Sequence, residues 1–90
     1  MKRAVQKAVG GPSSAAEKTG GQDCALALLQ RSIEFGHGRL SVLRLALAAQ
    51  AGALVPAEHW NYCKEIIERA DDPTLRETFL TAISFAQQPP

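Results

Sequence analysis

The stretch LSVLRLALAAQAGALV, residues 40–55, decides the fold of this chain. Its sixteen residues are apolar except for Ser41, Arg44, Gln50 and Gly52. A surface helix needs one apolar stripe and one polar face, so a segment that is apolar on nearly every side must be covered by several neighbours or by another chain. We therefore expect this stretch to form the central helix of a small bundle, with more apolar surface than its neighbours can cover.

Helix signals on both sides of this stretch predict three further helices. Asp23 is placed to cap the start of the first helix, and the glycines of Gly36-His37-Gly38 are placed to end it. Pro56 and the pair Asp72-Pro73 are typical of helix starts, and no segment alternates with the period of a strand. The predicted fold class is all-α, a small four-helix up-down bundle of two αα-hairpins over residues 23–90. The expected helices cover about 23–35, 39–51, 56–70 and 73–87.

Residues 1–22 precede the predicted bundle and are rich in Gly, Ser, Ala and Lys. The breakers Gly10-Gly11-Pro12 and Gly20-Gly21 interrupt any helix there, so we expect a flexible tail. Three cations in its first seven residues could contact an acidic surface: Lys2, Arg3 and Lys7. The tail could also be a targeting or export label, in which case the protein would be a secreted substrate.

The charge balance and hydropathy restrict the partners. The net charge is +1, but residues 23–90 carry six Lys or Arg against eight Asp or Glu, so the predicted bundle has a formal charge of −2. An acidic domain is a poor match for the phosphate backbone of nucleic acids. The chain has no apolar region typical of a signal peptide, and its longest apolar run falls short of the ~20 residues that a bilayer requires. We expect a cytoplasmic protein without a membrane partner.

The sequence shows no motif typical of a metal site, a catalytic nucleophile or a phosphate-binding loop. His37 lies between two glycines and His59 adjoins Trp60 near a predicted helix start, and neither belongs to a metal-binding motif. Ser41 and Ser84 lack the nucleophile-elbow context, and no glycine-rich phosphate loop is present. We therefore expect no catalytic residue, no metal site, no cofactor and no small-molecule substrate.

Helical spacing predicts which side chains are buried. Both cysteines are expected to be reduced core residues, although an exported protein could join them in a disulfide bond. In the first helix, the expected stripe consists of Cys24, Ala25, Leu28, Leu29 and Ile33, and Cys63 lies on the stripe of the third helix. In the central helix, the residues left to meet solvent are Arg39, Ser41, Arg44 and Gln50.

The apolar surplus of the central helix favours a protein–protein interface. The candidate interface residues are Leu40, Leu43, Arg44, Leu47 and Tyr62. Tyr62 is included because it stands two residues after Trp60 and so points in a different direction, although its ring could equally pack on the bundle. The expected partner is a second copy or another protein. The chain would then act as a small adaptor, anti-regulator or chaperone-like subunit.

A nucleic-acid-binding regulator is the alternative. Ala48 and Gly52 stand four residues apart, as in the turn of a helix-turn-helix motif. However, Glu58 and Asn61 occupy positions where the second helix of that motif is apolar, and glutamates on this helix would repel phosphate. Plain hairpin packing explains Ala48 and Gly52 better. A small dimeric transcriptional regulator that uses its basic tail and a degenerate helix-turn-helix to bind nucleic acid stays open as the second hypothesis.

Overall fold

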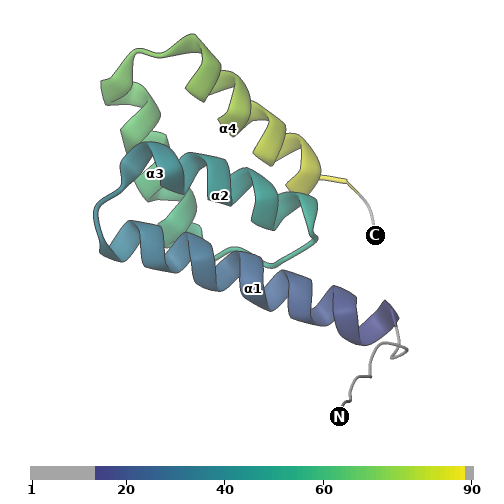
Figure 1. Ribbon diagram of the computed structural model, residues 1–90. Coiled ribbons are helices and arrows are strands. Elements are labelled where there is room, and N and C mark those ends of the chain that lie inside the picture. Colours follow the sequence, from purple (N-terminus) through teal and green to yellow (C-terminus); the bar gives the residue numbers. More distant parts are fainter. Residues whose placement is uncertain (1–13, 89–90) are drawn as a thin grey trace.

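The computed structural model describes residues 14–88, which form four α-helices and no strand (Figure 1). The helices are α1 (Ser14–Glu34), α2 (Gly38–Gln50), α3 (Ala57–Ala70) and α4 (Pro73–Ala86). The all-α class and the four-helix bundle are thus confirmed. The bounds of α2, α3 and α4 agree with the predicted ones to within one residue at each end.

The central position predicted for residues 40–51 is also confirmed. Figure 1 shows α2 between α1 and α4, and α2 packs against all three other helices. Among the described residues, α1 and α4 do not come within 8 Å of each other, measured between Cα atoms. A square up-down bundle would place α2 and α4 on a diagonal, whereas here they pack directly. As a result α3 packs across the layer of α1, α2 and α4, and α2 keeps one side that no helix covers.

The first helix begins nine residues earlier than predicted. The structure places Ser14 at its start, so residues 14–22, which the sequence assigned to the tail, are helical, and Asp23 lies inside the helix instead of capping it. The glycine pair 20–21 disfavours a helix by about 1 kcal/mol per residue relative to alanine. Helix propagation is much easier than nucleation, however, so a segment already held by its partners can extend through such a site.

A tertiary hydrogen bond supports this extension. The side chain of Gln22 donates from Nε2 to the carbonyl oxygen of Ala51, at 3.0 Å, just beyond the end of α2. Residues 1–13, and with them the candidate tail contacts Lys2, Arg3 and Lys7, lie outside the described residues.

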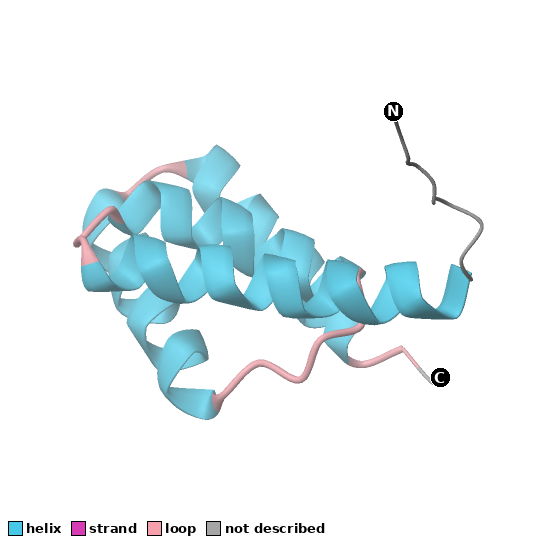
Figure 2. Cartoon of the chain, turned by 60° about the horizontal axis from the view of Figure 1, so that its bottom comes forward, coloured by secondary structure: helices cyan, strands magenta, loops and turns pink. Residues whose placement is uncertain are grey.

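The turns follow the predicted signals. Gly36 and Gly52 adopt positive φ angles of 73° and 83° after α1 and α2, a conformation that favours glycine. The side chain of Asp72 caps α4 by accepting from the backbone N–H of Thr74 at 3.0 Å and of Leu75 at 3.4 Å. An extended connection leads from the end of α2 to the start of α3 (Figure 2, pink).

Gly38 marks a close approach of two helices. A Cβ atom at this position would lie 2.6 Å from Cδ1 of Ile66, so the start of α2 sits against α3 with no room for a side chain. This contact brings the buried face of α2 onto α3.

The core is a single apolar cluster to which all four helices contribute. Leu29 comes from α1, Cys63 and Ile67 from α3, and Leu75 and Phe79 from α4. Trp60 packs edge-on against Phe79, with ring centroids 5.9 Å apart. The buried residues of α2 in this cluster are Val42, Leu45, Ala48 and Ala49.

Two serines are buried between α1 and α2. Ser41, which was expected to meet solvent, is fully buried beside Ser32, and their Oγ atoms are 2.9 Å apart. Ser32 Oγ lies 2.7 Å from the carbonyl oxygen of Leu29, and Ser41 Oγ lies 2.8 Å from that of His37. Because each hydroxyl has one proton, one serine donates to the carbonyl of its own helix and accepts from the other serine, so both hydroxyls are hydrogen-bonded and their burial is tolerable.

Two predictions for α1 are wrong. Cys24 is exposed, and Leu28 keeps 43% of its surface exposed, although both were expected in the core. The buried side of α1 is centred on Leu29, with Leu26 and Ile33 packed against the core cluster, and it is therefore rotated away from Cys24 and Leu28.

Candidate protein interface on α2

Two leucines of the central helix remain exposed. Leu43 and Leu47 keep 48% and 57% of their surface exposed, and they lie one turn apart on the same side of α2. On the opposite side, Val42 and Leu45 are fully buried. We call the exposed pair Leu43 and Leu47, together with the half-buried Leu40 and Arg44 beside them, the α2 face.

Two arginines lie at the edges of the α2 face, Arg44 within it and Arg39 beside it, and both are bound to their own chain. Arg39 Nη1 donates to Oδ2 of Asp72 at 2.6 Å, which joins α2 to the start of α4. Arg44 Nη1 donates to the carbonyl oxygen of Leu28 at 2.9 Å, which joins α2 to α1. The face therefore has an apolar centre between two anchored cations, the arrangement found in many protein interfaces.

The ion pair of Arg39 affects the titration of its partner. The hydrogen bond from the Arg39 side chain, followed by the one from the Leu75 backbone, lowers the pKa of the Asp72 carboxyl below its ordinary value. Asp72 is thus ionised at neutral pH and compensates the positive charge at this edge of the α2 face.

The structure brings four of the five predicted interface residues together. Leu43 and Leu47 are exposed, and Leu40 and Arg44 flank them. Tyr62 lies on α3, where it is partly buried and packs against the core cluster, which leaves less of its ring available to a partner.

Sequence reasoning missed Leu28 as a candidate. Its backbone carbonyl receives the side chain of Arg44, so it lies on α1 close to the α2 face. Leu26 was the available signal, since it packs against the core cluster and its burial places Leu28 at the outer edge of the buried side of α1.

Other large apolar side chains are exposed at scattered places. Phe35 and Leu54 lie in or next to the connections, and Leu80 lies on α4 with 56% of its surface exposed. Isolated exposed apolar residues are normal on protein surfaces. Leu80 is nevertheless useful as a control, because it matches Leu47 in residue type and exposure.

No chemistry-bearing cluster is found in the part of the chain that the structure describes. That part holds no group of three or more His, Cys, Asp or Glu side chains that could bind a metal. Cys24 and Cys63 are free thiols, and burial raises the pKa of Cys63 to about 11, so this thiol stays protonated at neutral pH.

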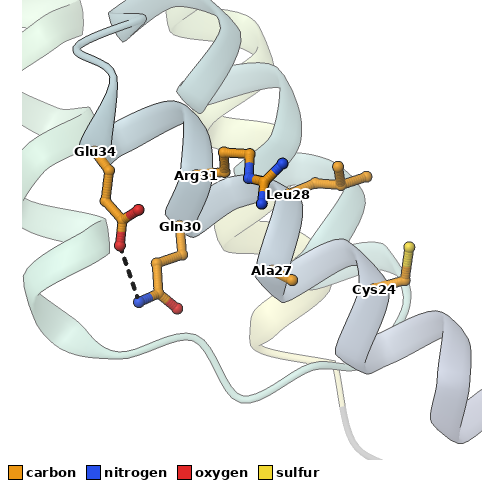
Figure 3. Close-up of a pocket in the computed structure, with 6 residues that line it drawn as sticks. All are labelled: Cys24, Ala27, Leu28, Gln30, Arg31 and Glu34. Atoms are coloured by element: carbon orange, nitrogen blue, oxygen red, sulfur yellow. Dashed lines mark hydrogen bonds between the residues drawn. The ribbon is translucent and has the colours of Figure 1, made fainter.

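A shallow depression of about 270 Å³ lies along the outer surface of α1 (Figure 3). All the side chains that line it belong to this one helix, among them Cys24, Leu28 and Arg31, and Gln30 Nε2 lies 3.4 Å from Oε2 of Glu34. No second element closes it, so it does not enclose a ligand.

Helix packing and turn geometry explain the two residues on which the helix-turn-helix hypothesis depends. Ala48 is fully buried where α2 packs on its neighbours, and Gly52 adopts the left-handed turn after α2. Glu58 is exposed in the first turn of α3. The nucleic-acid hypothesis relies on the basic residues before Ser14 and stays a prediction.

The arrangement defines a small all-α domain with one open face on its central helix. Searches against protein-family models, curated proteins and solved structures returned no significant match for this chain. Within residues 14–88, no helix combines the length and apolar character needed to cross a membrane.

Proposed function

We propose that this chain is a small protein-interaction module that pairs with a second copy of itself through the α2 face. The observation that supports the proposal is the exposure of Leu43 and Leu47 on the helix that every other helix contacts. Exposed apolar residues on the most central element stay open because α1 and α4 flank α2 without closing over it.

A two-fold axis suits this face. In an antiparallel crossing of two α2 helices, Leu43 of one copy meets Leu47 of the other, and the same residues are used twice. The anchored Arg39 and Arg44 would form the rim of such an interface, where charged groups keep contact with water.

The biological role that fits this chemistry is that of an adaptor, an anti-regulator or a chaperone-like subunit. Such a module acts by covering a helical or apolar surface of another protein. A partner that competes for the α2 face would exchange the self-paired form for a mixed complex. The cytoplasmic location expected from the sequence accompanies this proposal, and we further propose a bacterial source.

The test compares charged variants by size-exclusion chromatography with light scattering. We expect Leu47→Glu, and more so Leu43→Glu with Leu47→Glu, to convert the protein to a folded monomer. Leu80→Glu places the same charge on α4 at a site of equal exposure, and it should leave the dimer intact. Circular dichroism of each variant verifies that the helices are retained.

The proposal is wrong if Leu47→Glu and Leu80→Glu have the same mass and the same helicity as the unmodified chain. It is also wrong if only Leu80→Glu changes the mass, because the contact would then lie on α4.

A further inference from the structure

A second surface feature lies at the end of the bundle where α2 and α4 both terminate. An open cleft of about 750 Å³ is formed there by the last turns of these helices, the connection after α2 and the first turn of α3. Figure 1 shows the C-terminal ends of α2 and α4 at the same end of the molecule. The volume falls in the range of roughly 300–1,000 Å³ that is typical of small-molecule sites.

The wall of the cleft combines aromatic rings with carboxamides. Trp60 and Phe85, both partly buried, provide its apolar part. Gln22, Gln50 and Gln88 stand around it with side chains that both donate and accept hydrogen bonds. An apolar body with a few polar groups is the usual composition of a ligand site.

The described residues that line the cleft include no charged side chain that could pair with a charged ligand. No Lys, Arg, Asp or Glu is among the described residues that line it. A charged ligand would lose hydration there without a counter-charge, which is unfavourable. The partial negative charge at the C-terminal ends of α2 and α4 is opposed by the partial positive charge at the N-terminal end of α3, which also lines the cleft, so the helix ends supply no one-sided counter-charge.

We infer that this cleft binds an uncharged amphipathic small molecule. Its apolar body would pack on Trp60 and Phe85, and its polar groups would exchange hydrogen bonds with the glutamine amides. This site goes beyond the sequence, which predicted no small-molecule ligand. It is also independent of the proposed self-pairing, since neither Leu43 nor Leu47 lines it.

Two dyes with the same aromatic framework test the inference: neutral N-phenyl-1-naphthylamine and anionic 8-anilino-1-naphthalenesulfonate. Trp60 is the only tryptophan of the chain, so energy transfer from it reports binding close to the cleft. We expect saturable transfer to the neutral dye and roughly tenfold weaker binding of the anion, because the sulfonate would lose hydration in the cleft without a counter-charge.

Matched variants assign the binding to the cleft. Ala86→Phe fills the cleft from the end of α4 and should weaken the neutral dye at least roughly tenfold, since overfilled sites exclude ligands. Ala27→Phe makes the same change on the outer surface of α1 and should bind as before. Leu54→Ser, at a residue that is 92% exposed, removes an apolar side chain of the cleft without a risk to folding, and it should weaken binding.

Three results would overturn the inference: no saturable binding of the neutral dye, equal binding of the two dyes, or equal weakening by Ala86→Phe and Ala27→Phe. The variant with Leu43→Glu and Leu47→Glu separates the two proposals. It should lose self-pairing and keep dye binding, and loss of dye binding in this variant would place the dye on the α2 face.

Discussion

The two sides of α2 have similar composition but different environments. One side, with Val42 and Leu45, is fully buried against the other three helices, whereas the other side presents Leu43 and Leu47 to solvent. Burial of a leucine contributes about 1.5–3 kcal/mol relative to exposure, so the first side stabilises the fold, whereas about half of the surface of Leu43 and Leu47 stays in water. The difference shows that an apolar helix can be central without being enclosed.

The largest expected effect compares two leucine truncations on α2. Leu45→Ala should lower the free energy of unfolding by about 2–5 kcal/mol, because it leaves a cavity in the core. Leu47→Ala should lower it by less than about 1 kcal/mol in dilute monomer, since much of this side chain already contacts water. Urea titration at low protein concentration measures both.

Equal losses in the two variants would contradict the distinction between the sides of α2. The same urea titration at high protein concentration tests the distinction between the two sides further. Self-pairing adds stability that depends on concentration, and Leu47→Ala alone should remove that part.

The second effect concerns Cys63, which belongs to the core cluster that covers the buried side of α2. Burial raises the pKa of this thiol to about 11, above the value of about 9 expected in the unfolded chain. Its contribution to stability is therefore complete below pH 9 and is lost as the pH rises toward 11. It should amount to about 2 kcal/mol by pH 11.

Unfolding experiments between pH 8 and 11 on the unmodified chain and on Cys63→Ala measure this loss as the difference in slope. Cys24→Ser serves as the control, because it replaces the cysteine that is exposed on α1. A slope that is unchanged in Cys63→Ala would mean that the thiol is not buried in solution.

A smaller effect is expected from the serine pair at the edge of the buried side. Ser41→Ala should destabilise by about 1 kcal/mol, since it removes a partner of the buried Ser32 hydroxyl. The double replacement of Ser32 and Ser41 by alanine should cost less than the sum of the single replacements, with a coupling of at least about 0.5 kcal/mol. A double-mutant cycle in urea decides this, and strict additivity would contradict the direct contact.

The smallest effect lies at the border of the exposed side. The hydrogen bond from Arg39 lowers the pKa of Asp72, so this carboxylate stabilises the fold above about pH 4, and the contribution is lost as the pH falls below that value. Asp72→Asn should retain the cap but lose this acid dependence. Thermal melts from pH 2 to pH 6 measure it, with Glu77→Gln as a control. If Asp72→Asn keeps the same acid dependence of stability, that dependence comes from other carboxylates.

Local signals predicted most of the fold. The glycines at 36 and 52, the Asp72-Pro73 pair and the apolar run of α2 specify their structure through backbone geometry and hydrogen bonding close in the sequence. The early start of α1 could not be read in this way, because the contact of Gln22 with Ala51 joins positions 29 residues apart.

The candidate interface was predicted in part. The exposure of Leu43 and Leu47 agrees with the surplus of apolar residues in α2. Ser41 was misplaced because a polar residue at a core position looks like a surface residue when its buried partner, here Ser32, is unknown. Leu28 was misplaced because Leu26, and not Cys24, lies on the buried side of α1. The cleft beside Trp60 escaped notice because it is assembled from residues of all four helices and one connection.

The most direct test of the exposed side of α2 is sedimentation equilibrium of the unmodified chain over concentrations from micromolar to millimolar. We expect a reversible shift from the mass of one chain to the mass of two as the concentration rises. The mass of a single chain at every concentration would contradict self-pairing through Leu43 and Leu47.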